Sequence, residues 1–70
     1  MIQPGDIYRH YKGNEYRIIT VSATCSETLQ QLVVYQDIQE PDKIWVRPYE
    51  MFFDHIELDE KLVERFTKVI

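Results

Sequence analysis

Cysteine is nearly absent from this sequence: Cys25 is the only one in 70 residues. No disulfide can form within the chain, and zinc sites built from several closely spaced Cys or His ligands are excluded. A chain this short buries only about 60% of the surface that its unfolded form exposes. We therefore predict a single domain over residues 1–70, without metal or other cofactor. An apolar core stabilises it, and self-association into a homodimer is a further source of stability.

A basic excess is also absent, because 12 acidic residues outnumber 8 basic ones and the formal net charge is −4. Broad, nonspecific DNA binding needs a positive surface, so this balance argues against it while leaving a local basic patch open. No apolar run approaches about 20 residues, and Met1–Gly5 lacks the basic and apolar regions of a signal peptide. We expect no membrane association and, by default, a cytoplasmic location.

The first third of the sequence alternates between apolar and polar residues, as half-buried β-strands do. Asp6–Lys12 predicts a first strand. Gly13-Asn14 suits a tight hairpin turn into a second strand, Glu15–Thr24. The apolar phase of this second strand slips near Ile18-Ile19, which indicates either a bulge or a strand covered on both faces.

Further strands and a short helical turn follow. The predicted elements are a third strand from Leu29 or Gln31 to Asp37, a fourth strand over Ile44–Arg47, a helical or 3₁₀ turn over Tyr49–Phe53 and a strand that ends at Leu58. Pro48 ends the fourth strand because it has no N–H to donate to a sheet. Within the fourth strand we expect Ile44 and Val46 on one face and Trp45 and Arg47 on the other; if Ile44 and Val46 point inward, Trp45 and Arg47 lie on the outer face or on a second core face.

The C-terminal segment satisfies two patterns at once. A helical stripe is formed by Leu62, Val63, Phe66, Val69 and Ile70. The same segment could equally form a β-hairpin that turns at Asp59-Glu60-Lys61. Periodicity alone favours the helix slightly.

Several blocks of the sequence occur in the order seen in a known family. They are Tyr8–Gly13 followed by Tyr16, Ser26–Leu29, Leu32–Tyr35, and Trp45–Pro48 with Glu50–Phe52. On these blocks the chain resembles the DUF1653 family of small, uncharacterised bacterial proteins. The resemblance implies a mostly β fold, a small SH3-like β-barrel of five or six short strands. It implies no activity, because the family has no assigned function.

The chain departs from the family pattern in two places. Relatives often have His at the position of Cys25, so any chemistry of that His would differ here. Relatives also tend to have Gly and Pro in the segment that matches Asp59–Glu64, and those residues favour a hairpin. The resemblance therefore favours the hairpin over the helix for the C-terminal segment.

Aromatic residues are the strongest functional signal, because they exceed what one small core easily absorbs. Aromatic rings beside basic groups suit stacking or peptide docking. We name as the aromatic-basic strip the five residues Tyr8, His10, Tyr35, Trp45 and Arg47. The leading interpretation is a noncatalytic binding module that recognises a peptide or protein through this strip. The alternative is an RNA-binding or nucleotide-binding module on the same strip, which a steep salt dependence would reveal. In a purely structural interpretation these aromatics are core residues.

Two individual residues leave further alternatives open. Arg47 could pair with Glu27 or Glu50 as a structural clamp, or it could hold an anionic group of a ligand. Cys25 with a histidine, His10 or His55, could form a thiol or hydrolytic enzyme, which predicts a depressed Cys25 pKa. Neither an oxyanion hole nor a third orienting group is recognisable in the sequence, so we expect no catalytic residues.

Overall fold

The architecture is described from a computed structural model that covers residues 1–70. The elements are β1 (Ile7–His10), β2 (Glu15–Thr24), β3 (Gln31–Asp37), β4 (Ile44–Pro48), α1 (Tyr49–Phe52), β5 (His55–Leu58), β6 (Lys61–Glu64) and β7 (Phe66–Lys68). The mostly β prediction is confirmed, as is the helical turn after the fourth strand. Nothing helical in the structure has the length and hydropathy that a membrane-spanning helix needs.

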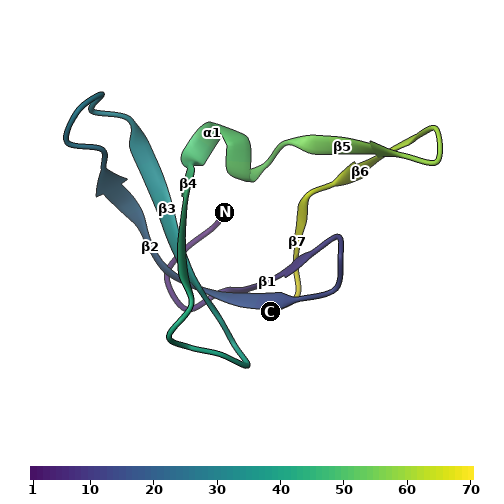
Figure 1. The fold of residues 1–70 in the computed structure, drawn as a ribbon, viewed down its shortest axis with the longest axis horizontal. Coiled ribbons are helices and arrows are strands. Elements are labelled where there is room, and N and C mark those ends of the chain that lie inside the picture. Colours follow the sequence, from purple (N-terminus) through teal and green to yellow (C-terminus); the bar gives the residue numbers. More distant parts are fainter.

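The strands form two antiparallel sheets. The larger one has the strand order β4-β3-β2-β1-β7, and the smaller one pairs β5 with β6. Figure 1 shows β2, β3 and β4 on one side of the molecule and β7 on the other. In this view β1 lies along the bottom, and α1, β5 and β6 cross the top. No ladder joins β4 to β7, so the five-stranded sheet does not close into a barrel and has two edges.

Turn chemistry and a bulge shape the first half of the sheet. Gly13 has φ +110° in the β1–β2 hairpin, a conformation that glycine adopts without a steric penalty. The register between β2 and β3 shifts between Ile18 and Thr20, which confirms the predicted bulge. The side chain of Ile18 is buried, whereas that of the extra residue Ile19 is partly exposed. Bulges increase the bend of a strand, and β2 accordingly pairs with β1 over its first part and with β3 along its length.

The register between β3 and β4 decides which face of β4 points inward, which the sequence left open. Trp45 lies opposite Tyr35 and Arg47 opposite Val33, and both of these β3 residues are buried. Residues directly opposite each other share a face of the sheet, so Trp45 and Arg47 face the core side. Ile44 and Val46 point to the other face and are 56% and 57% exposed. The predicted pairing of residues on the two faces is confirmed, and the orientation with Ile44 and Val46 inward does not occur; both parities of this strand carry apolar residues, so only the register with β3 decides between them.

The C-terminal segment is a hairpin followed by a short strand, and the helical alternative is wrong. Asp59 and Glu60 have φ 51° and 65° in the two-residue turn between β5 and β6. Positive φ at both central residues is the geometry that suits a tight hairpin. The chain then returns to the larger sheet, where β7 pairs with β1. Seven strands result, instead of the predicted five or six.

The core is an aromatic cluster below α1. Its members are Ile2, Tyr8, Ile18, Val33, Tyr35, Phe52 and Phe66. Phe52 from α1 stacks on Phe66 from β7, with ring centroids 4.3 Å apart, and its side chain is 0% exposed. Tyr8 and Tyr35 contact Phe52 edge-on at 5.4 and 5.6 Å. Each such aromatic pair adds about 0.5–1.5 kcal/mol beyond the area it buries.

Candidate functional site: an aromatic-basic hollow

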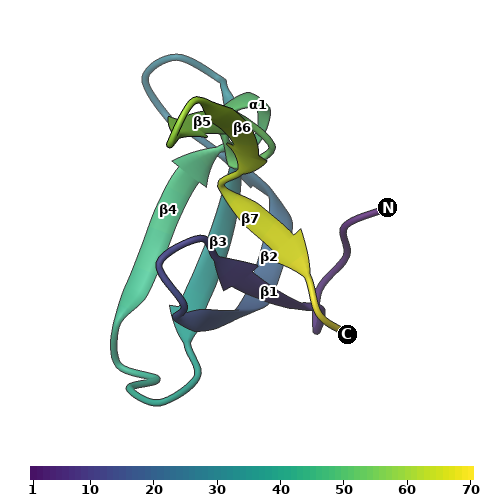
Figure 2. The same ribbon diagram turned by 90° about the vertical axis from the view of Figure 1, so that its right-hand side faces the viewer.

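A surface hollow of about 180 Å³ opens beside the core, on the inner face of the five-stranded sheet. Every strand of that sheet contributes to its lining, which consists of His10 (β1), Tyr16 (β2), Tyr35 (β3), Trp45 and Arg47 (β4) and Phe66 (β7). Figure 2 shows β4 along one side of the sheet and β1 with β7 on the other. We call this site the aromatic-basic hollow. Segments far apart in the sequence therefore meet in it.

The structure brings together four of the five residues of the predicted strip. His10, Tyr35, Trp45 and Arg47 line the hollow. Tyr8 does not, because its side chain is only 6% exposed and packs edge-on against Phe52. It lies in the middle of β1, under α1, whereas His10 lies at the end of the strand. Tyr8 is therefore a core residue, and it is not exposed to a partner as the predicted aromatic-basic strip requires.

Sequence reasoning missed two residues of the hollow, Tyr16 and Phe66. Tyr16 lies directly opposite Tyr8 in the β1–β2 hairpin, so a hairpin register would have placed it on the inner face. Phe66 reaches the site only because β7 pairs with β1, where it lies opposite His10. No local signal in the sequence predicts that long-range pairing.

Phe66 is the centre of the hollow's aromatic wall. The rings of His10, Tyr35 and Tyr16 approach it edge-on, with centroids 5.0, 5.4 and 6.0 Å away. Trp45 takes part in none of these ring pairs, and its side chain remains 49% exposed. The wall is thus held rigidly by packing, while the tryptophan at the rim is free to contact another molecule.

Arg47 supplies a positive charge that forms no ion pair, although, after Arg65, it contributes to lowering the pKa of Asp54. Its guanidinium carbon lies 5.9 Å from the centroid of Phe66, and it forms none of the four ion pairs of the protein. The predicted clamp to Glu27 or Glu50 is therefore absent. Its Nε is buried and has no hydrogen-bond partner. A buried donor left unpaired costs about 1–3 kcal/mol.

Other basic groups lie near the hollow but add no free charge to its lining. Burial lowers the pKa of His10, and the charges of Arg65, Lys12 and Arg47 lower it further, in that order. The guanidinium of Arg65 is already paired with Asp54, with nitrogen–oxygen distances of 2.6 and 3.1 Å. Arg47 is thus the lining residue that offers an unpaired cation, although the whole chain is acidic.

Cys25 lies away from the hollow, in the turn beyond the end of β2. The pKa of its thiol is lowered by hydrogen bonds from the hydroxyl and N–H of Thr28 and from the N–H of Glu27. No histidine contributes to this shift, and His10 lies beyond the opposite end of β2. The structure therefore does not form the Cys-His pair that the enzyme interpretation needs. No group of three His, Cys, Asp or Glu side chains is placed to hold a metal ion.

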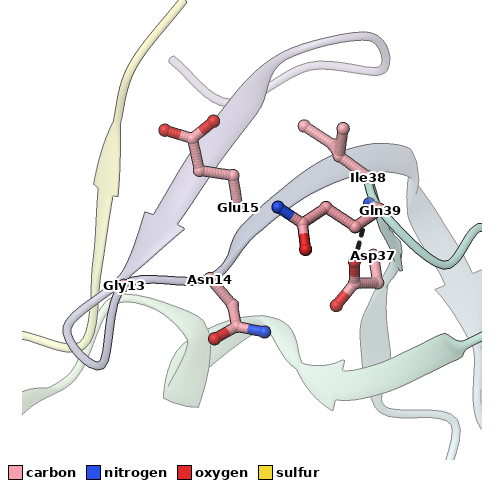
Figure 3. A pocket seen from close by; sticks show the side chains of 6 residues that line it. All are labelled: Gly13, Asn14, Glu15, Asp37, Ile38 and Gln39. Atoms are coloured by element: carbon pink, nitrogen blue, oxygen red, sulfur yellow. Dashed lines mark hydrogen bonds between the residues drawn. The ribbon is translucent and has the colours of Figure 1, made fainter.

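A second depression, of about 220 Å³, separates the β1–β2 turn from the β3–β4 loop (Figure 3). It is lined by Gly13, Asn14, Glu15, Asp37, Ile38 and Gln39. The carboxylate of Asp37 accepts the backbone N–H groups of Gln39 and Glu40, and the bond from Glu40 is the largest cause of its lowered pKa. Glu15 is paired with Arg9. Since both acids are already used in local structure, this depression lacks a free functional group.

These features define a small all-β protein with one rigid aromatic site beside a free cation. Residues 6–68, nearly the whole chain, match the family described as a protein of unknown function, DUF1653. The chain therefore belongs to the DUF1653 family, as the resemblance predicted. No curated protein and no solved structure was found to match it.

Proposed function

We propose that this protein is a noncatalytic binding module, and that it recognises a peptide or protein segment through the aromatic-basic hollow. The observation that carries the proposal is Arg47, whose guanidinium rests over Phe66 with its Nε buried and unpaired. An unpaired guanidinium beside an aromatic wall favours a ligand that combines a carboxylate with an apolar group.

The size of the hollow supports a peptide over a free small molecule. Sites for drug-sized molecules have volumes of about 300–1,000 Å³. A hollow of about 180 Å³ is smaller and accommodates a single side chain. A ligand that fills it with one side chain must gain its remaining affinity from the surrounding surface, as an extended peptide does.

RNA or nucleotide recognition is the second candidate, and the observation in its favour is Trp45. A half-exposed indole beside a free guanidinium is a platform on which a base can stack. The net charge of −4 weighs against it, because nucleic-acid affinity depends mainly on phosphate contacts. Peptide recognition therefore remains the first proposal.

The SH3-like character of the fold is also part of this proposal. In the strand order β4-β3-β2-β1-β7 the last strand pairs with the first, and a helical turn follows β4. This order, with the β5–β6 hairpin as an insertion, supports an SH3-like arrangement. Small barrels of that kind bind peptides along an aromatic strip, which agrees with the position of the hollow.

The test is an NMR titration of the labelled protein with a random peptide pool and, separately, with an oligonucleotide pool. We expect shifts at Trp45, Arg47 and His10 with the peptide pool, and their loss in Trp45→Ala. Ile44→Ala is the matched control, because Ile44 lies on the same strand but on the opposite face. Shifts with oligonucleotides alone that vanish steeply with salt would select the RNA candidate. Absence of shifts in both titrations would contradict both candidates.

A further inference from the structure

The outer edge of β4 is free for pairing, and its polarity can be assigned residue by residue. The N–H of Asp37 donates to the carbonyl of Lys43 at 3.0 Å, so the Lys43 carbonyl points toward β3, while its N–H donates to the carbonyl of Glu40 in the loop. In antiparallel sheets this direction alternates along a strand. The backbone groups of Ile44 and Val46, and the nitrogen of Pro48, therefore point away from the sheet. Pro48 has no N–H, and proline is tolerated where that side of a strand faces solvent.

The N-terminal part of this edge, Ile44 to Val46, carries little protection against pairing. Natural edge strands are shielded by charged side chains, by proline, by very short length or by covering segments, and here Pro48 and the inward-facing Arg47 shield only the C-terminal end of β4. Ile44, Trp45 and Val46 are uncharged, and each is about half exposed. The one charge in the strand, Arg47, lies in the hollow. The carbonyl of Pro48 belongs to the start of α1, so the free edge offers two donors and two acceptors, those of Ile44 and Val46, next to exposed apolar side chains.

A second copy of the chain fits this edge poorly. If two β4 strands paired about Trp45, Lys43 of one copy would lie opposite Arg47 of the other, and like charges would meet. If they paired about Val46, Arg47 would lie opposite Trp45, which has no acceptor, and Ile44 opposite Pro48, which has no donor. Neither register supplies the carboxylate that Arg47 lacks.

We propose that an extended, acidic segment of a partner protein adds to β4 as a sixth strand of the larger sheet. This inference rests on the proposed function, because the same segment enters the aromatic-basic hollow. Its backbone bonds to the outward groups of Ile44 and Val46. Residues opposite Trp45 and Arg47 share their face, so one apolar side chain packs on the indole and one carboxylate reaches the guanidinium. Main-chain bonds supply affinity, and these two side chains supply specificity.

The experiment begins with selection of binders from a random peptide library on the immobilised full chain. We expect selected peptides to alternate apolar residues and to carry Asp or Glu at one position. Replacing that acid by its amide should weaken binding roughly tenfold. Arg47→Gln should remove the acid preference. Arg17→Gln is the matched control, because Arg17 is an exposed arginine outside the hollow and should retain the preference.

Amide hydrogen exchange with the tightest selected peptide then tests the strand itself. The amides of Ile44 and Val46 should exchange more slowly in the complex. The amide of Trp45, already directed toward β3, should be unchanged and is the internal control. A peptide that shifts Trp45 without slowing Ile44 and Val46 would overturn strand addition and leave the proposed function intact. If no selected peptide shifts Trp45, both fail. If the Val46 amide is protected from exchange in the free protein and sedimentation shows a dimer, β4 pairs with a second copy of the chain, and the inference is overturned.

Discussion

The two edges of the larger sheet differ in how they are protected. At one edge, β7 has only three residues, its Phe66 is buried, and the Lys68 ammonium lies 3.6 Å from the carboxylate of Asp6. At the other edge, β4 has five residues and exposes apolar side chains on both faces. A short, charged edge resists pairing, whereas a longer apolar edge invites it. The contrast is the reason that the proposed binding edge is placed on the β4 side of the molecule.

The two edges are connected through α1. This short helix follows β4 directly, and its Phe52 stacks on Phe66 of β7. The contact holds the ends of an open sheet together without a hydrogen-bonded ladder between them. It also fixes the position of Phe66, which is the centre of the hollow's wall. The stability of the protein and the shape of the site therefore depend on the same pair of rings.

The largest expected effect is that of Phe52→Ala, which removes the connection between the edges. Truncation of a fully buried phenylalanine costs about 3–5 kcal/mol, which is most of the stability that so small a domain has. Phe53→Ala is the matched control, because Phe53 is the next residue in the chain and its own ring is 40% exposed. Urea unfolding, monitored by the fluorescence of Trp45, measures the free energy of unfolding of both variants. Equal losses in the two variants would contradict the role assigned to Phe52.

A lysine placed on each edge in turn sharpens the comparison. Val46→Lys adds a charge to the open edge and should weaken the selected peptide roughly tenfold, since a charged edge disfavours an added apolar strand. Thr67→Lys makes the same change on β7 and should leave affinity unchanged. Both positions are exposed, so the loss of stability should be small, and larger for Thr67→Lys, which removes the bond from the Thr67 hydroxyl to the Arg9 carbonyl and places a lysine opposite Arg9. Calorimetric titration gives the affinities. Equal weakening by both lysines would show that the edges do not differ.

The Asp54–Arg65 pair, which precedes β7, should contribute a smaller, pH-dependent stabilisation. Arg65 lowers the pKa of Asp54, so the folded state favours the carboxylate. This contribution is present above the carboxyl pKa of the unfolded chain, about 4, and is lost as pH falls through the lower folded value. Asp54→Asn should cost about 1 kcal/mol at neutral pH. Thermal unfolding against pH should show a flatter acid limb in this variant, and an unchanged slope would contradict the assignment.

The smallest expected effect is a shift in the titration of His10. Burial and three nearby cations lower its pKa, so the unfolded chain binds more protons and stability declines as pH falls below about 6.5. Arg47→Gln removes one of those cations and should raise the pKa of His10, while Arg17→Gln should not. A bound carboxylate at Arg47 should act in the same direction. NMR titration of the imidazole resonances measures the pKa of His10. If Arg47→Gln leaves that pKa unchanged, the guanidinium of Arg47 does not lie near His10.

The sequence predicted the features that depend on neighbouring residues. Gly13 marked the first hairpin, and the change of apolar phase at Ile18 marked the bulge. The orientation of β4 was not predictable, because Ile44 and Trp45 are both apolar and the strand reaches its register only through the polar β3–β4 loop. The C-terminal hairpin was ambiguous for a related reason: Asp59 and Glu60 adopt positive φ although neither is glycine.

The candidate site was predictable in part for the same physical reason. Trp45 and Arg47 share a face because they are two residues apart on one strand, whichever way that face points. Phe66 enters the site through pairing between β1 and β7, which join opposite ends of the chain. Hydrophobic pattern carries no information on such a contact, because any buried strand could supply the ring.

Pro48 limits how long a bound strand can be held. Beyond Val46 the edge has no further donor, and the chain turns at once into α1. A segment anchored over so few residues should leave quickly, because affinity within one type of interface is set mainly by the dissociation rate. We therefore expect short residence times for single sites. A partner that carries several copies of the segment, or that gathers several of these modules, would gain its strength from the raised local concentration.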